Sequence, residues 1–420
     1  MTAEQLKASV LQMAIEGKLV PQLDDEPAVD IEAVEPEEAP FSIPEKWKWV
    51  QLKELGTTQT GTTPSTSKKN YYGNYIPFVK PGDIVDNKVT YRSDGLSNEG
   101  ASVGRIAPNG SVLMVCIGGT IGKVCYIDRD VSFNQQINSI TPDRDFACGW
   151  YVFFALASEY FYKQVRLQAT GTATPIIKKS TWQNILLPLP PRAEQERIVA
   201  RLNEILPLIE EYGKAHSALK NAEQALPDQL RASLLQEAIQ GKLVPQLEDE
   251  PAVEIAGEEP EEVPFAIPEK WKWVRIEDVF TLQAGKFIQA SEIKEAGTFP
   301  CYGGNGLRGY VEKSNRKGRF PLIGRQGALC GNINMADGEF YATDHAVVVD
   351  CHEHGDPDCV GYFLRAMNLN QYATATAQPG LAVKNINKLF FPLPPLAEQR
   401  RIVARLEELL PHVDAIAGLR

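Results

Sequence analysis

The stretch that decides the fold is LKASVLQMAIEGKLVPQLDDEPAV at residues 6–29, because it recurs as LRASLLQEAIQGKLVPQLEDEPAV at residues 230–253. The likeness continues at the same offset through Val279, and 34 of the 50 aligned positions are identical without a gap. A second repeat pairs LPLPPRAEQERIVARLNEILP at 187–207 with FPLPPLAEQRRIVARLEELLP at 391–411. Internal repeats of this length indicate a duplicated architecture.

Two stretches of unlike sequence, 50–187 and 274–391, separate the repeated segments. The N-terminal and C-terminal repeats together reproduce most of the central one, so the sequence predicts a pseudo-twofold molecule whose termini lie near each other. The predicted domains are a conserved helix at 1–23, an acidic linker at 24–46, a first variable domain at 47–187, a central helical region at 188–247, a second acidic linker at 248–270, a second variable domain at 271–391 and a conserved helix at 392–420.

The repeated segments have the periodicity of long helices. Apolar residues step by four and three, the spacing of a coiled coil, at Ile198, Leu202, Ile205, Ile209 and Tyr212 and again at Ile402, Leu406, Leu409, Val413 and Ile416. Pro190 and Pro191 are expected to begin the central helix, and Pro207 and Pro411 to kink the helices that contain them. The predicted fold class is therefore α+β, with two α/β domains separated by long antiparallel coiled-coil helices. A plain helical hairpin that only holds the domains together is the alternative.

The net charge of −11 for 420 residues argues at first sight against nucleic-acid binding. Two acidic stretches within the linkers, 24–38 and 248–262, however, hold 16 of the 54 acidic residues and no basic residue. Residues 50–187 of the first variable domain have a net charge of +4, and residues 303–330 of the second have +5. The average charge therefore does not exclude DNA. Seven cysteines without a C-x-x-C pair, no secretory signal and no long apolar run together predict a reduced, cytoplasmic protein.

Both variable stretches mix short strands with turns and end in a helix. The predicted elements are strands at 111–117 and 124–127 and a buried helix at 149–168 in the first, and strands at 320–323 and 346–349 and a helix at 359–372 in the second. Two weak echoes relate them, Ile117-Gly118 with Ile323-Gly324 and Asn134-Gln135-Gln136 with Thr343-Asp344-His345. We infer one α/β fold that carries two different surfaces.

Residues of types that contact DNA gather in loops of both variable domains. Lysine and arginine neutralise phosphates, whereas arginine, asparagine and glutamine can read base edges; a solvated basic surface is the alternative. The candidate DNA-binding residues are Lys68, Lys69, Asn70, Tyr72, Lys80, Lys123, Gln135 and Gln136 in the first domain, and Asn305, Arg308, Lys313, Arg316, Lys317, Arg319, Arg325, Gln326 and His345 in the second. The expected base readers are Asn70, Tyr72, Gln135, Gln136, Asn305, Arg308, Arg325 and Gln326.

Patterns typical of catalytic and metal sites do not hold up. The glycines of 304–309 match a dinucleotide pattern, but a basic, turn-rich stretch follows them, so we predict a turn. The phosphate-loop-like segment 118–124 has the wrong spacing and ends in Val124. Cys351, His352, His354 and Cys359 cluster without a standard zinc spacing. We predict no catalytic residue, no metal and no cofactor in this chain.

The L-P-x-P-P-x-x-E-Q-x-R-I-V segment at 187–199, its near copy at 391–403, and the I-P-x-x-W segments at 43–47 and 267–271 resemble the specificity subunit of Type I restriction–modification systems. The segments 117–123 with 134–138, and 322–331 with 342–346, also resemble the family's patterns. The resemblance implies that each variable domain reads one half of a bipartite sequence in double-stranded DNA, and that the coiled coil sets the spacer.

The same resemblance implies partners. The helices would dock two methyltransferase (M) subunits that carry S-adenosylmethionine, and restriction/translocase (R) subunits would supply ATP- and Mg²⁺-dependent cleavage; no membrane is involved. Two alternatives remain open at this point: a stand-alone nuclease or methyltransferase, and a protein-only helical scaffold that presents two peptide-binding domains.

Overall fold

The structure is a computed structural model that describes residues 1–34, 36, 39–91, 95–255, 260–327, 329–374 and 380–418. The chain divides into two units, Met1–Ala218 and Leu219–Arg420, and each is a mixture of helices and strands. The longest element is helix α6 (Arg192–Ile239), which contributes to both units. Among the described residues, no helix is long and apolar enough to cross a membrane.

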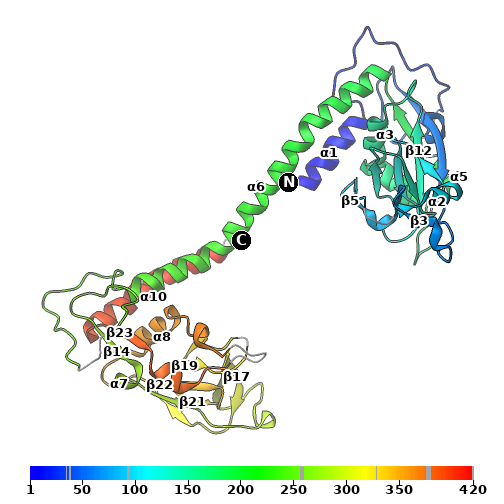
Figure 1. Cartoon of the computed structure of the whole chain (residues 1–420). Helices are drawn as coiled ribbons and strands as arrows, with labels where there is room; N and C mark the ends of the chain where they lie inside the picture. Colours follow the sequence, from blue (N-terminus) through cyan, green and yellow to red (C-terminus); the bar gives the residue numbers. More distant parts are fainter. Residues whose placement is uncertain are drawn as a thin grey trace. The chain divides into compact units, whose positions relative to one another are not determined.

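In unit 1, helix α1 (Ala3–Ile15) lies beside the first part of α6 (Figure 1). The sequence marks both ends of α1. Thr2 and Gln5 form a capping box at its start, which satisfies two free backbone N–H groups. After its end Gly17 adopts φ +71°, where a side chain would be strained and a Cβ would lie 2.3 Å from Pro44. The hydroxyl of Tyr212 on α6 donates to the Met1 carbonyl (3.0 Å).

The variable domain of unit 1 is built on two sheets. One has the order β10–β9–β12–β2 and the other β3–β7–β4–β11–β8. Their strands are β2 (Gly56–Thr60), β3 (Tyr72–Gly73), β4 (Ile76–Val79), β7 (Gly95–Leu96), β8 (Ile106–Ala107), β9 (Val112–Val115), β10 (Val124–Tyr126), β11 (Val131–Phe133) and β12 (Ile137–Pro142). Two ladders complete the unit: β1 (Lys48–Gln51) with β13 (Leu186–Leu189), and β5 (Ile84–Val85) with β6 (Lys88–Val89).

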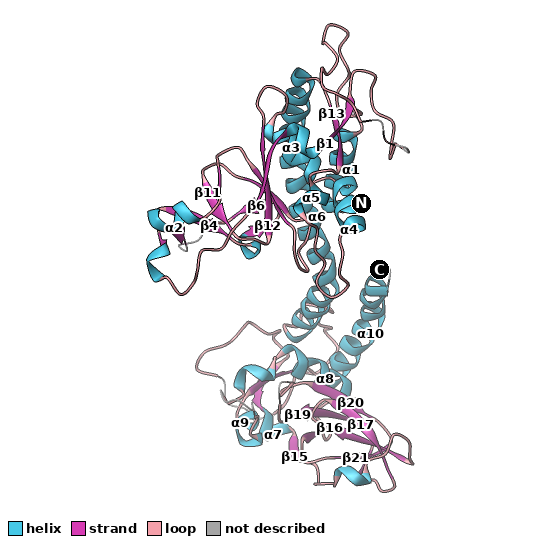
Figure 2. Cartoon of the chain, turned by 90° about the vertical axis from the view of Figure 1, so that its right-hand side faces the viewer, coloured by secondary structure: helices cyan, strands magenta, loops and turns pink. Residues whose placement is uncertain are grey.

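The helices of unit 1 pack around these sheets (Figure 2). They are α2 (Asn98–Val103), α3 (Gly149–Leu156), α4 (Glu159–Gln168) and α5 (Lys179–Trp182), with the 3₁₀ turns η1 (Leu52–Leu55), η2 (Lys69–Tyr71) and η3 (Pro81–Asp83). The predicted single helix at 149–168 is wrong, because it is broken into α3 and α4. Ser158 ends the first and caps the second by accepting a hydrogen bond from the Phe161 amide (3.2 Å).

Unit 2 repeats this plan. One sheet has the order β15–β22–β19–β20 and the other β17–β16–β21–β18. The strands are β14 (Lys272–Arg275), β15 (Thr281–Ala284), β16 (Phe299–Gly303), β17 (Gly306–Val311), β18 (Arg316–Lys317), β19 (Phe320–Gly324), β20 (Ile333–Ala336), β21 (Glu339–Ala342), β22 (Ala346–Asp350) and β23 (Phe390–Leu393). The helices are α7 (Ile276–Val279), α8 (Pro357–Ala366), α9 (Val383–Asn387) and α10 (Leu396–Gly418), with the 3₁₀ turns η4 (Ala290–Glu292) and η5 (Leu369–Tyr372).

One helical prediction is modified in unit 2, and the kinks predicted at two prolines of the long helices stay predictions. The predicted helix at 359–372 is split into α8 and η5 at Asn368, whose φ is +47°. Pro207 and Pro411 lie inside α6 and α10, and both helices continue past them. In unit 2, α10 packs against α6, and Arg231 on α6 forms an ion pair with Asp414 on α10 (2.5 Å).

Backbone hydrogen bonds place the two variable domains in one register. The amide of Asn134 donates to the Val79 carbonyl (3.1 Å), and the amide of Thr343 donates to the Tyr302 carbonyl in the same way (2.9 Å). The predicted correspondence of 134–136 with 343–345 is therefore confirmed. The other predicted echo is wrong: Gly118 corresponds to Gly327 and not to Gly324. Both begin the same turn, with φ of +96° and +89°, and accept at 3.1 and 3.0 Å from the amide three residues on.

The acidic stretches are anchored to the units that contain them. The ammonium of Lys46 donates to the carbonyls of Leu23, Asp24 and Glu26 at 2.7–2.8 Å. Its counterpart Lys270 does the same, to carbonyls at 247, 248 and 250. Acidic, proline-containing stretches of this kind are expected to be solvated connectors, but that expectation is wrong for Glu26 and Glu250. Their side chains are each only 10% exposed, because they form ion pairs with the arginines described next.

Each anchored stretch covers a buried carboxyl group at the start of a long helix. Glu26 is paired with Arg197, and Glu250 with Arg401 at 2.6 Å. Glu194 and Glu398 lie one helical turn before Arg197 and Arg401, and both residues are completely buried. Burial raises the pKa of both carboxyls, and the nearby tryptophan indoles and arginines offset only part of that effect. The two units therefore share the same small electrostatic cluster.

Candidate nucleic-acid interface

In unit 1, three segments meet at the end of the sheet that contains β9 and β12. The Thr62 amide donates to the Phe133 carbonyl (3.0 Å), and the Cys116 amide to the Gln136 carbonyl (2.8 Å). The Thr63 hydroxyl donates to the Gln135 side chain, which is exposed. Strand ends that are held by the backbone in this way form a firm base for exposed polar side chains.

The predicted DNA-binding residues of unit 1 are only partly gathered at this edge. Gln135 and Gln136 lie on it, and Lys123 is exposed on the adjoining turn before β10. Gln136 is half-buried, and its side-chain oxygen accepts a hydrogen bond from the Asn134 amide group (3.1 Å). Lys80 follows the end of β4, with its ammonium 5.8 Å from the centre of the Phe78 ring.

The remaining candidates of unit 1 form a separate loop around η2. The Asn70 amide group donates to the Glu99 carboxylate (2.7 Å), and the Tyr72 hydroxyl donates to the Pro64 carbonyl (2.7 Å). Lys68 contacts the Tyr71 ring, 4.9 Å from its centre, and Lys69 is exposed. The two expected readers in this loop thus already have partners inside the domain. Lys68 is exposed although its ammonium donates to the Tyr71 hydroxyl (3.0 Å), and Lys69 presents its charge to solvent.

In unit 2 the equivalent edge brings the four expected readers and His345 together. A turn at 304–305 joins β16 to β17, so the turn predicted for 304–309 is confirmed only for its first two residues, and Gly306 and Gly309 lie in β17. The Arg325 amide donates to the His345 carbonyl (3.0 Å), and the Asn332 side chain donates to that of Asn305 (3.3 Å). Gln326 follows directly in the chain and is exposed. The side chain of Arg308 lies over Gly303, where a Cβ would come within 2.4 Å of its Cδ.

Most other basic candidates of unit 2 are paired inside the domain. Lys313 binds Glu292 (3.0 Å), Lys317 binds Glu339 (2.9 Å), and Arg319 binds Asp358 (2.7 Å). These pairs raise the pKa of each basic group, mainly through the hydrogen bond to its carboxylate. Arg316 donates to the side chain of Gln283 (2.6 Å).

Arg308 and Arg325 differ from these residues. In the described part of the chain no carboxylate pairs with either of them. The +5 counted along residues 303–330 therefore overstates the charge available to a ligand, because the neutralising acids lie outside that stretch. Thr63 and Asn332 also lie at these edges and were not among the predicted residues, because only the shared backbone register shows which residues are their neighbours.

The structure does not gather Cys351, His352, His354 and Cys359 into a group with the ligands of a metal site. Among the described residues, no group of three or more histidine, cysteine, aspartate or glutamate side chains could hold a metal ion. Burial raises the pKa of Cys351 to about 12, which opposes the thiolate form that binds metals. The His352 ring bonds instead to the Thr281 hydroxyl (2.8 Å).

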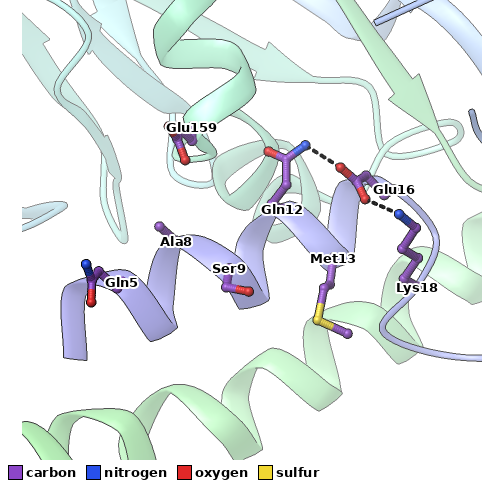
Figure 3. A pocket seen from close by; sticks show the side chains of 8 residues that line it. All are labelled: Gln5, Ala8, Ser9, Gln12, Met13, Glu16, Lys18 and Glu159. Atoms are coloured by element: carbon purple, nitrogen blue, oxygen red, sulfur yellow. Dashed lines mark hydrogen bonds and ion pairs between the residues drawn. The ribbon is translucent and has the colours of Figure 1, made fainter. Parts of the chain in front are cut away.

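A second surface lies along α1, away from the variable sheets (Figure 3). A shallow pocket there is lined by α1 and by Glu159 of α4. Gln12 and Lys18 both donate to the Glu16 carboxylate, at 2.8 and 2.6 Å. Four of the polar residues, Gln5, Ser9, Gln12 and Lys18, recur identically as Gln229, Ser233, Gln236 and Lys242, whereas Glu16 is replaced by Gln240. This polar surface is thus duplicated while the variable domains diverge.

Known proteins resemble this chain along most of its length. The family described as Type I restriction modification DNA specificity domain matches residues 44–214 and 268–418. The EcoprrI specificity subunit of Escherichia coli is 30% identical over 86% of this chain and 87% of its own length. The MjaIX specificity subunit of Methanocaldococcus jannaschii is 24% identical, over 84% of each chain.

Solved structures show the same fold. The crystal structure of the HsdS subunit from Thermoanaerobacter tengcongensis matches with a TM-score of 0.56 at 21% identity, over 91% of this chain and 94% of that one. A chain from a structural study of complex assembly in the type I R-M system matches with a TM-score of 0.55 at 20% identity, over 90% of this chain and 93% of that one. The chain therefore belongs to the family of Type I restriction–modification specificity subunits.

Proposed function

We propose that this chain is the non-catalytic DNA-recognition subunit of a Type I restriction–modification complex. The observation that carries the proposal is one backbone scaffold, present twice, with different side chains at the same edge. Residues 134–136 are Asn-Gln-Gln in unit 1, and the corresponding residues 343–345 are Thr-Asp-His in unit 2. A duplicated fold with unlike readers suits an asymmetric target in two parts.

The pseudo-twofold repeat supports a bipartite mode of reading. Each variable domain, 47–187 and 271–391, would read one half of the target in double-stranded DNA. The coiled-coil helices would set the non-specific spacer between the halves. Because one chain holds both domains, binding of the second half would become effectively intramolecular, which multiplies specificity.

The duplicated polar surface supports docking of two identical partners. Gln5, Ser9, Gln12 and Lys18 on one copy and their equivalents on the other present the same side chains. We propose that two methyltransferase subunits, which carry S-adenosylmethionine, bind these helices. Restriction/translocase subunits would join with ATP and Mg²⁺, and the reacting groups would then all lie on partner subunits.

The test is to locate methylated adenines genome-wide in cells with and without this gene. We expect a bipartite motif that loses methylation on deletion and regains it on complementation. A chain in which only residues 47–187 are replaced by those of a relative should then change one half of the motif. Unchanged methylation after deletion, or a change in both halves after the replacement, would contradict the proposal.

A further inference from the structure

In unit 2, the edge that holds Asn305, Arg308, Arg325 and Gln326 is called the reading edge below. Three large apolar side chains are exposed there. Phe287 is 73% exposed, Leu329 is 54% exposed and Leu307 is 52% exposed. A folded domain can leave single apolar residues on its surface at little cost. These three, however, come from three segments that are far apart in the sequence, so their gathering at one edge calls for a common cause.

Backbone contacts place these segments together. The Lys286 amide, next to Phe287, donates to the Ala342 carbonyl (3.0 Å), and the Phe287 carbonyl accepts from the Tyr341 hydroxyl (3.1 Å). A Cβ on Gly324 would lie 2.0 Å from the Gly304 carbonyl and 3.3 Å from the Leu329 carbonyl. The Leu329 turn therefore adjoins the turn that leads into β17, the strand of Leu307 and Arg308.

Unit 1 offers an internal comparison, because its backbone has the same register. The amide of Gly61 donates to the Ile137 carbonyl and that of Gly285 to the Ala346 carbonyl, so Thr63 corresponds to Phe287. The amides of Lys123 and Asn332 donate to the carbonyls three residues earlier, so Thr120 corresponds to Leu329. The same two positions are thus hydroxyl-bearing in one domain and apolar in the other.

The neighbours of these apolar residues indicate what they contact. Arg308 and Arg325 lie on the same edge without carboxylate partners among the described residues, which favours an anionic ligand. In the major groove, guanidinium groups bind phosphates and guanine, and the apolar group that the bases display is the 5-methyl of thymine.

We propose that the second variable domain reads thymine 5-methyl groups through Phe287 and Leu329, whereas the first domain reads its half-site through hydroxyl and amide groups. This inference rests on the proposed function and adds the chemistry by which the two half-sites are distinguished. Phe287 and Leu329 are accordingly specificity-determining residues that residue type alone did not single out.

The experiment uses the assembled complex of this chain with its methyltransferase subunits. Its ligands are DNA duplexes that carry the motif found by the methylation experiment. Deoxyuridine replaces every thymine in one half-site or in the other, which removes only the 5-methyl groups. We expect the affinity to fall about three- to fivefold per contacted methyl in one half-site only. The variants Phe287→Ser and Leu329→Ser, whose side chains keep a hydroxyl but offer no methyl group, should abolish that sensitivity.

Leu167→Ala, which removes a 78% exposed leucine on α4 of unit 1, is the matched control and should keep the full response to deoxyuridine. If the wild-type complex discriminates its motif but responds equally to deoxyuridine in both half-sites, or to neither, the inference is wrong while the proposed function stands. If the wild-type complex does not discriminate its motif from scrambled DNA, the proposed function itself fails.

Discussion

At the scale of single residues, the basic side chains that matter are those without partners inside the domain. Arg325 has no carboxylate partner in the described structure, whereas Lys317 is held by Glu339 at 2.9 Å. Both were predicted DNA-binding residues, and nothing in the sequence around them separates them. An ammonium that is already paired must break that contact before it can bind a phosphate.

Replacing Arg325 by alanine is therefore expected to relax the specificity of one half-site at one base position, by about 1–3 kcal/mol of discrimination. Lys317→Ala is the control and should change discrimination by less than about 0.5 kcal/mol. The measurement is binding of the assembled complex to a panel of single-base variants of the motif. A uniform loss of affinity across the panel would instead make Arg325 a phosphate contact.

The buried carboxyls of Glu194 and Glu398 make stability depend on pH. A carboxyl whose pKa is raised by folding stabilises the folded state fully only below its unfolded pKa of about 4.3. That contribution is lost as the pH rises through the higher folded pKa. Above its folded pKa, each group is a buried charge that the nearby indoles and arginines compensate only in part.

The double variant Glu194→Gln, Glu398→Gln keeps both side chains neutral. We expect its melting temperature to exceed that of the wild type at pH 7.5, and the difference to shrink as the pH falls toward 4. Scanning calorimetry across this range measures it. The control is Glu210→Gln, on the exposed surface of α6, whose melting temperature should differ from the wild type by the same amount at every pH. If the difference for the double variant were also independent of pH, the explanation would be contradicted.

At the scale of elements, local sequence patterns predicted the strands well but missed the breaks within the predicted helices. Strands were expected at 111–117 and 346–349, and the structure has β9 and β22 there. The break at Ser158 was missed because apolar residues continue on both sides of it. The pairing of Arg319 with Asp358 was also missed, since 38 residues separate them and only the packing of α8 on β19 brings them together.

The anchored acidic stretches show how one side chain can hold a connector. Lys46 serves three carbonyl oxygens, and its removal would leave them without that donor. We expect Lys46→Met to lower the free energy of unfolding by about 1–3 kcal/mol, measured by chemical denaturation. Lys53→Met is the control, since Lys53 is exposed and lies 4.0 Å from Glu54; an equal effect of the two variants would show that Lys46 is not an anchor.

At the scale of the whole molecule, duplication explains why sequence revealed the architecture more readily than the site. The repeated segments fix helices and connectors through features that occur twice, such as Gly17 with Gly241 and Lys46 with Lys270. The reading edges occur once each, so no internal copy shows which of their side chains matter. Their grouping emerges only when hydrogen bonds between distant strands put both domains in one register.

The proposed spacer function can be tested by lengthening α6 at residues 217–224. All eight of these residues are exposed, so an insertion there spares the buried contacts that α6 makes in each unit. Seven helical residues add about 10 Å and nearly preserve the helical phase, which corresponds to at most about three base pairs. We therefore expect the methylated motif to keep both half-sites and gain spacer length. A helix-breaking Gly-Pro insertion of equal length should blur the spacing instead, and a motif with an unchanged spacer would refute the role of α6 as a ruler.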